Sequence, residues 1–335
     1  MTTDVAVVAY AHTEWVDHDP REEAQLVQEV VDRVLADAAI PMTEVGFTCS
    51  GSSDYLIGRP FSFVSAIDGI CAWPPISESH VEMDGAWALY EAWVKLQIGH
   101  IDIALVYAFG KPSTGDINQV LGAQLDPYTL APLGLDARAV AGLQARAFLD
   151  SGQAKEGDFR AVAERAGAAV DKRAPYSAAP LRAYDEAKTK DGAVAILLAS
   201  GDRAKELAAR PAWIRGIAHR IEAHQPGLRD LSRSVSTHDA GVAAGATGRA
   251  VDVAEVHANF SHQELMVLNE LGLSAETRIN PSGGAMANNP VMATGLARIG
   301  EVAAAIFDGS ASSGVAHASA GPAMQQNLVA LLEAD

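Results

Sequence analysis

The sequence lacks several features on which whole classes of protein depend. It has only two cysteines, Cys49 and Cys71, too few for a disulfide framework or a cysteine-based metal motif. We therefore expect buried structural thiols in a cytoplasmic protein without a bound metal. No run of about 18 apolar residues is present, so no membrane-spanning helix is expected. The first residues, Met1–Asp4, lack the basic start of a secretory signal peptide.

Positive charge is scarce as well. The chain has 25 Lys and Arg against 42 Asp and Glu, a net charge of −17, which argues against binding to a nucleic-acid backbone. A ligand that carries phosphates would need a local basic patch. What the chain does have is apolar content, 49% of its 335 residues, which is enough for one large core or two joined cores.

Short apolar runs alternate with helix-like segments along most of the chain. Continuous apolar runs are typical of strands covered on both faces, and apolar residues three and four apart are typical of helices. Strands are predicted at 5–10, 47–49, 102–110, 191–199, 214–219, 253–256, 313–317 and 327–332. Helices are predicted at 22–38, 86–96, 136–150, 158–172, 261–271 and 293–307. The alternation predicts an α/β protein with a parallel sheet between helical layers.

Two stretches interrupt this alternation. Residues 59–79 are rich in proline, serine and aromatic residues, and we predict a loop with a short helix that forms a cavity wall or a subunit contact. Residues 112–190 contain many proline, glycine and polar residues around two predicted helices. They predict a separate loop region.

The stretch 279–295 reads Ile-Asn-Pro-Ser-Gly-Gly-Ala-Met-Ala-Asn-Asn-Pro-Val-Met-Ala-Thr-Gly. Gly283 and Gly284 allow the backbone to approach another backbone or a ligand closely, and the two Asn-Pro pairs predict turns. We therefore predict a tight loop that leads into a helix N-terminus, where N–H groups can hold an anion or a developing oxyanion. The alternative is that the glycines form only a tight connection.

The same stretch also resembles a known family. Asn-Pro-Ser-Gly-Gly followed by an Ala-Thr-Gly helix start is similar to the C-terminal active-site loop of the thiolase superfamily. Residues 253–261, Val-Ala-Glu-Val-His-Ala-Asn-Phe-Ser, resemble the His-Asp-Cys-Phe segment of sterol-carrier-protein-type thiolases and of actinobacterial lipid-transfer thiolase-like proteins. The resemblance implies a five-layer α-β-α-β-α sandwich of two similar halves, residues 1–200 and 201–335, with a short loop domain at about 112–190.

Three of the four catalytic positions that the resemblance locates have changed. Thiolases use a cysteine at a helix N-terminus, where the helix dipole lowers its pKa; the matching residue is Glu82, three residues before Gly85. The base histidine is matched by Asn289 and the second cysteine by Ser319. Only His257 keeps the family residue.

Each candidate also has a structural interpretation. Glu82 and Asp84 either cap the following helix or act in catalysis. His257 orients a thioester carbonyl, takes a proton from a β-hydroxyl, or is a hydrogen-bonded core residue. The other candidate acid–base groups are His317, Tyr55 and Tyr90, and the candidates for substrate binding are Asn280, Gly283 and Gly284.

Three functions stay open. The first is a retro-aldol carbon–carbon lyase acting on a β-hydroxyacyl-CoA, since this chemistry needs a base and an enolate site but no covalent nucleophile. Lipid-transfer-type relatives perform it on steroid side chains together with a small OB-fold acyl-CoA-binding partner. The second is an inactive thiolase-like subunit or lipid-transfer protein that supports an active paralogue. The third is an acyltransferase with an unrecognised nucleophile.

The resemblance also sets expectations for ligands and assembly. The CoA thioester is the expected substrate, and no separate cofactor is expected. We expect at least a homodimer, because the apolar, tryptophan-containing stretch 86–96 would otherwise be exposed. A second thiolase-like subunit is an alternative partner.

Overall fold

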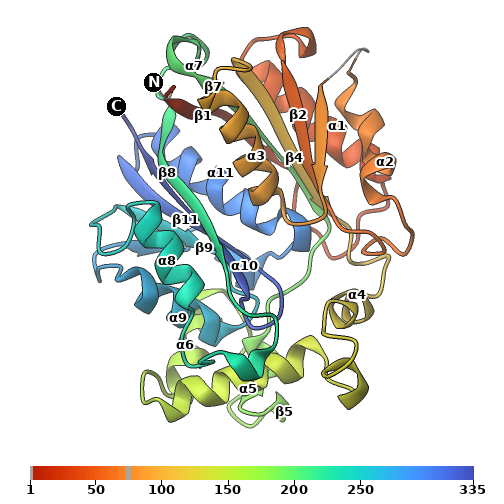
Figure 1. The fold of residues 1–335 in the computed structure, drawn as a ribbon, viewed down its shortest axis with the longest axis vertical. Coiled ribbons are helices and arrows are strands. Elements are labelled where there is room, and N and C mark those ends of the chain that lie inside the picture. The colour runs from red at the N-terminus through yellow and green to blue at the C-terminus, as the bar shows by residue number, and fades with distance from the viewer. Residues whose placement is uncertain (1–2, 73–76) are drawn as a thin grey trace.

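The computed structural model describes residues 3–72 and 77–335 (Figure 1). The first half of the chain contributes the strands β1 (Val5–His12), β2 (Phe47–Gly51), β3 (Glu78–Val81), β4 (Ile103–Gly110) and β7 (Gly192–Ser200). The second half contributes β8 (Ala212–Ile221), β9 (Val253–Val256), β10 (Arg278–Ile279), β11 (Ser313–Ala320) and β12 (Gln326–Glu333). All the predicted strands are present; β3 and β10 are additional and too short to carry a sequence pattern.

The two halves repeat one strand order. The order is β3-β2-β4-β7-β1 in the first half and β10-β9-β11-β12-β8 in the second. In both, the three strands at one edge pair in parallel, and the fourth strand pairs antiparallel with both of its neighbours. The sheet is therefore mixed, and the prediction of a parallel sheet holds only for three strands of each half. The halves join where Ala6 and Val7 of β1 pair with Trp213 and Ala212 of β8. The duplication is therefore present in the topology, although the residues show no repeat.

Helices fill the space between the two halves and cover their outer faces. α3 (Gly85–Gln97) and α11 (Thr294–Phe307) pack in one core with strand residues of both halves. α1 (Glu23–Asp37), α2 (Ser62–Ile67) and α7 (Gly201–Leu207) lie outside the first half, and α8 (Val235–Ala243) and α9 (Ser261–Leu271) outside the second. Strand β1 contacts both the inner and the outer helices, because its side chains alternate between the two faces of the sheet. Val5 and Val7 face α3 and α11, while Ala6 and Val8 face α1. This arrangement confirms the predicted five-layer sandwich.

The loop region covers one end of the sandwich, at the bottom of Figure 1. It contains α4 (Ile117–Ala123), α5 (Ala137–Asp150), α6 (Glu156–Arg165) and a hairpin of β5 (Tyr176–Ala178) and β6 (Leu181–Arg182). α5 and α6 pack on α9 through Phe148 and Phe159. The prediction that the second helix runs to residue 172 is wrong, because α6 ends at Arg165.

Two sequence expectations need correction. The stretch 86–96 does not leave a large apolar surface, because Trp87, Leu89 and Leu96 are buried between the halves. Cys71 is exposed, whereas Cys49 is buried as expected. The short helix predicted within 59–79 is present as α2; β3 begins at the end of this stretch, and residues 73–76 lie outside the described part of the chain. Within the described ranges, the helices are all too short or too polar to cross a membrane.

Candidate active site

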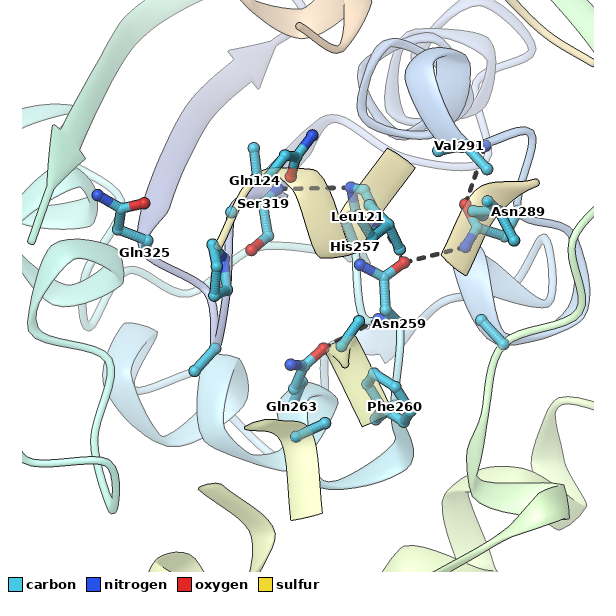
Figure 2. A pocket seen from close by; sticks show the side chains of 18 of the residues that line it. Leu121, Gln124, His257, Asn259, Phe260, Gln263, Asn289, Val291, Ser319 and Gln325 are labelled. Atoms are coloured by element: carbon cyan, nitrogen blue, oxygen red, sulfur yellow. Dashed lines mark hydrogen bonds between the residues drawn. The ribbon is translucent and has the colours of Figure 1, made fainter. Parts of the chain in front are cut away.

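A cavity of about 850 Å³ lies where the loop region covers the junction of the two halves. Its walls come from α4, α5, the segment 183–189, the loops that follow β9 and β11, and the segment before α11. Five of the expected site residues line it: Glu82, Asp84, His257, Asn289 and Ser319. Figure 2 shows the side chains of the last three around this space. The fold thus brings together most of the positions that the resemblance located.

Asp84 connects the first turns of two helices. Its Oδ1 accepts hydrogen bonds from the N–H groups of Ala86 (2.8 Å) and Leu296 (3.0 Å), and its Oδ2 accepts one from Gly295 (2.7 Å). Asp84 is thereby the N-cap of α3 and also occupies the N-terminus of α11. Burial raises the pKa of Asp84 to about 7, and the three N–H donors oppose that rise. The helix N-terminus that was expected to hold an anion therefore binds a carboxyl group of the chain itself.

Glu82, at the position of the thiolase nucleophile, is exposed. Its Oε1 accepts a hydrogen bond of 2.5 Å from the N–H of Asp54, and its Oε2 lies 3.3 Å from Nε2 of His80. The capping interpretation is therefore wrong for Glu82 and confirmed for Asp84. Glu82 keeps access to the cavity as an ionisable carboxylate.

His257 follows β9 and is 3% exposed. Its Nδ1 accepts a hydrogen bond of 3.4 Å from the N–H of Ser319, and its Nε2 lies 3.3 Å from Oδ1 of Asn259. Burial lowers the pKa of His257 to about 3, and the neighbouring His317 contributes to the shift. The imidazole is therefore neutral at physiological pH, and it is a weak base.

Two asparagines continue this network along the same wall. Asn289 Nδ2 donates to Asn259 Oδ1 (2.9 Å), while Asn289 Oδ1 accepts from the N–H of Val291 (3.1 Å) and the hydroxyl of Thr294 (2.6 Å). The N–H of Asn259 donates to Oε1 of Gln263 (3.1 Å). Figure 2 shows Asn259 between His257 and Gln263. The shared hydrogen bonds fix the orientation of both amide groups.

His317 lies behind this wall and is not among the residues that line the cavity. It is fully buried, and its Nε2 is 2.9 Å from Oδ1 of Asn327. Burial lowers the pKa of His317 to about 4. Tyr55 and Tyr90 are also outside the set of lining residues. The structure thus separates these three groups from the other acid–base candidates.

Asn280, Gly283 and Gly284 also lie outside the set of lining residues. Asn280 Oδ1 accepts from the N–H of Val256 (2.7 Å) and Nδ2 donates to Glu264 Oε2 (2.7 Å). Both glycines have a left-handed backbone, with φ of +92° and +63°, and begin the one-turn helix α10 (Gly284–Ala287). These contacts fit the tight-connection alternative.

A buried ion pair anchors the same loop. Arg298 Nη1 donates to Glu255 Oε2 (2.6 Å) and to Ser282 Oγ (2.8 Å). The Ser282 N–H donates to Glu255 Oε1 (3.0 Å). Arg298 and Glu255 are at most 1% exposed, so each needs the other as a partner. The Asn-Pro-Ser-Gly-Gly motif is thus fastened to β9 and α11.

The structure adds residues that the sequence did not single out. Asn259, within the segment matched to the family, and Gln263, two residues after it, line the cavity. Their amides offer no proton chemistry, so nothing in the sequence marked them as candidates. His224 and Arg138 come from segments without a motif. None of the described lining residues is a cysteine, and the described ranges contain no cluster of three or more His, Cys, Asp or Glu that could hold a metal ion.

Comparison with known proteins supports the assignment of the fold and the superfamily. No family model matches the chain. Over 148 residues, 37% of the chain, it is 30% identical to an acetyl-CoA acetyltransferase of Methanothermobacter thermautotrophicus, and the match spans 38% of that protein's length. Over 313 residues, 81% of the chain, it is 25% identical to the 17-hydroxy-3-oxo-4-pregnene-20-carboxyl-CoA lyase of Mycobacterium tuberculosis, and the match spans 79% of that protein.

Two solved structures share the fold over nearly the whole chain. An Ltp2-ChsH2(DUF35) aldolase matches with a TM-score of 0.79 at 19% identity and covers 99% of this chain and 98% of its own. The human mitochondrial 3-ketoacyl-CoA thiolase matches with a TM-score of 0.79 at 14% identity and covers 99% of both chains.

The chain therefore has the thiolase fold and is a homologue of thiolase-superfamily proteins. Over most of its length it is similar in sequence to a 17-hydroxy-3-oxo-4-pregnene-20-carboxyl-CoA lyase, and it shares its fold with the solved Ltp2-ChsH2(DUF35) aldolase. The resemblance found in the segments around His257 and Gly283 is thereby confirmed.

Proposed function

We propose that the chain binds an acyl-CoA thioester of lipid or steroid catabolism and cleaves a carbon–carbon bond in a β-hydroxyacyl-CoA by a retro-aldol reaction. The observation that carries the proposal is the cavity of about 850 Å³ at the thiolase active-site position, lined by His257, Asn259 and Asn289 and without a cysteine among its described lining residues. Such a site can stabilise an enolate oxygen through fixed donors and needs no covalent acyl intermediate.

The reaction requires two different kinds of group. A base takes the proton of the β-hydroxyl, the bond between Cα and Cβ breaks, and Cβ becomes a carbonyl carbon. The electron pair remains on Cα as the enolate of the thioester, and a proton then adds to Cα. The site must therefore offer hydrogen-bond donors to the enolate oxygen and a proton acceptor to the hydroxyl.

The geometry argues against the base role for His257 and leaves its remaining ring N–H as a donor to Asn259, which lines the same wall. Its Nδ1 already accepts a hydrogen bond from Ser319, and its pKa of about 3 makes it a poor base near pH 7. Of the expected residues that line the cavity, Glu82 and Asp84 are then the proton acceptors. The pKa of Asp84, about 7, is suited to a general base, whereas Glu82 is the more accessible of the two.

An inactive subunit is the second candidate. Two observations favour it. An exposed carboxylate, that of Glu82, occupies the position of the thiolase nucleophile. The oxygens of Asp84 already accept three backbone hydrogen bonds. In this case the chain would bind an acyl-CoA or support an active paralogue without turnover.

We also propose a cytoplasmic complex with a homodimer core and a small OB-fold acyl-CoA-binding partner or a second thiolase-like subunit. β3 lies at an edge of the sheet, and an unpaired edge can pair with a second copy. The solved Ltp2-ChsH2(DUF35) aldolase, named for two components, supports a heteromeric assembly.

The test is an assay with the purified chain, alone and with a co-expressed OB-fold partner. It is incubated with a steroid side-chain β-hydroxyacyl-CoA, and the products are followed by mass spectrometry. A lyase yields a ketone or aldehyde and a shortened acyl-CoA in equal amounts, without a trapped thioester. Binding without cleavage in both preparations favours the inactive subunit, and absence of binding contradicts both functions.

A further inference from the structure

The orientation of Asn259 follows from two backbone groups that can only donate. At one end of the network, the N–H of Val291 donates to Asn289, so the acceptor atom of Asn289 is its oxygen. The Nδ2 of Asn289 therefore faces Asn259 and requires Oδ1 of Asn259 as its acceptor, 2.9 Å away. This relay assigns the amide of Asn259 without reference to any ligand.

The other end of the network gives the same answer. The N–H of Ser319 donates to Nδ1 of His257, so the neutral ring carries its proton on Nε2. That Nε2–H then donates to Oδ1 of Asn259 at 3.3 Å. If the amide of Asn259 were turned over, its NH₂ group would meet two donors. Both ends thus place the oxygen of Asn259 inside the wall.

The NH₂ group of Asn259 is consequently left for the cavity. Its oxygen accepts both internal hydrogen bonds, and in the described part of the chain no acceptor takes a hydrogen bond from its Nδ2. Figure 2 shows the nitrogen of Asn259 turned away from Asn289, on the side of the open space. Fixed neighbours hold this donor in place before any ligand arrives, which is the condition for strong stabilisation of a developing charge.

We propose that Asn259 Nδ2 is the donor that binds the carbonyl oxygen of the acyl thioester and the enolate oxygen derived from it. This inference rests on the proposed function and adds the residue that touches the reacting oxygen. His257 then acts as a positioning residue, because its Nε2–H is directed at Asn259 Oδ1. Asn289 positions the same amide from the other side.

The test compares two ligands that differ only in the carbonyl oxygen. Palmitoyl-CoA contains the thioester carbonyl, and S-hexadecyl-CoA has a CH₂ group in its place; neither has the β-hydroxyl needed for cleavage. We expect the wild-type chain to bind palmitoyl-CoA about 3- to 10-fold more tightly, the range for one neutral hydrogen bond. In Asn259→Asp, which keeps the shape and both internal hydrogen bonds, the preference for the thioester should disappear.

Two controls make the outcome decisive. Asn259→Ala should also lose the preference, and its affinity for S-hexadecyl-CoA reports whether the cavity is intact. Asn288 is a partly buried neighbour of Asn289 outside the cavity wall, and Asn288→Ala should retain the wild-type preference.

A wild-type chain that binds both ligands equally, or an Asn259→Asp variant that still prefers the thioester, overturns the assignment of Asn259 while acyl-CoA binding stands. A wild-type chain that binds neither ligand overturns the proposed function and this inference together.

Discussion

The carboxyl group of Asp84 accepts a hydrogen bond of 2.7 Å from the N–H of Gly295, and this contact joins the start of α3 in the first half of the chain to the start of α11 in the second. The approach is possible because residue 295 is a glycine; a Cβ there would lie 2.6 Å from Oδ1 of Asp84 and 2.5 Å from Cβ of Ala318. A single side chain thus satisfies N–H groups of two helices at the back of the cavity.

Asp84→Ala should strongly destabilise the protein. The variant leaves the N–H groups of Ala86, Gly295 and Leu296 buried without their acceptor, and we expect a loss of about 2–4 kcal/mol in the free energy of unfolding. The matched control is Asp136→Ala, because Asp136 caps α5 through one bond to Ala139 and should cost only about 1 kcal/mol. Urea denaturation measures both, and equal losses would contradict the connecting role.

Stability should also depend on pH through Asp84. Its pKa is about 7 in the folded protein and 3.8 for the ordinary side chain, so between these values the folded state retains a proton that the unfolded state has lost. Stability therefore falls as the pH rises through this window.

The stability difference between the wild type and Asp84→Asn, which cannot titrate, should shift by up to about 4 kcal/mol in favour of the variant from pH 4 to pH 7.5. Denaturation curves at several pH values check this. A difference that is constant with pH would show that Asp84 does not titrate in this range.

The sequence predicted the fold through features that are local along the chain. The buried strands β4 and β7 are continuous apolar runs, and α11 shows its apolar spacing plainly, so these elements were expected at nearly their observed bounds. α8 was missed because it lacks a clear apolar stripe and presents residues such as Ser236, Thr237 and Gly241 to the core. β3 and β10 owe their pairing to neighbouring strands, which no local pattern reveals.

The candidate site was predictable only in part for the same reason. The resemblance located His257, Asn289 and Ser319, and all three line the cavity. The sequence could not separate them from His317, two residues before Ser319, because alternate residues of a strand point to the same face. Ser319 lines the cavity because it lies closer to the end of β11 that borders it. Asn259 was found only through the hydrogen-bond network, in which Asn289 contacts Asn259 from 30 positions away and Ser319 contacts His257 from 62 positions away.

Gly284→Ala tests whether the Gly-Gly loop is structural. Gly284 has a φ of +63°, and a Cβ there would lie 2.7 Å from Cγ of Asn280, so we expect a loss of about 1–3 kcal/mol in stability. Because Gly284 does not line the cavity, the affinity of the folded variant for palmitoyl-CoA should equal that of the wild type.

The matched control for this loop is Gly157→Ala in α6, where a Cβ meets only the end of Arg160 at 3.7 Å. It should leave stability unchanged or raise it by up to about 1 kcal/mol. A folded Gly284→Ala protein with weakened acyl-CoA binding would restore the loop as part of the binding site.

His257→Ala separates the donor role from the base role in the proposed lyase. As a positioning donor, His257 holds the amide of Asn259, and its loss should lower kcat about 10²–10³-fold, the cost of losing one preorganised oxyanion contact. Because the pKa of His257 is about 3, His257 should not titrate between pH 5 and 8. The profiles of kcat/KM against pH should therefore have the same inflections in this range for the wild type and the variant.

The matched control is His262→Gln. His262 is equally buried, and burial lowers its pKa to about 3 as well, but it donates to Gln144 outside the cavity wall. His262→Gln should lower the melting temperature, because it disturbs packing in the core. It should leave kcat within about twofold, because His262 does not hold any group that contacts the reacting oxygen. An inflection near pH 6.5 in the wild type that is lost in His257→Ala would instead identify His257 as the base, and an unchanged rate in a folded variant would remove it from the site.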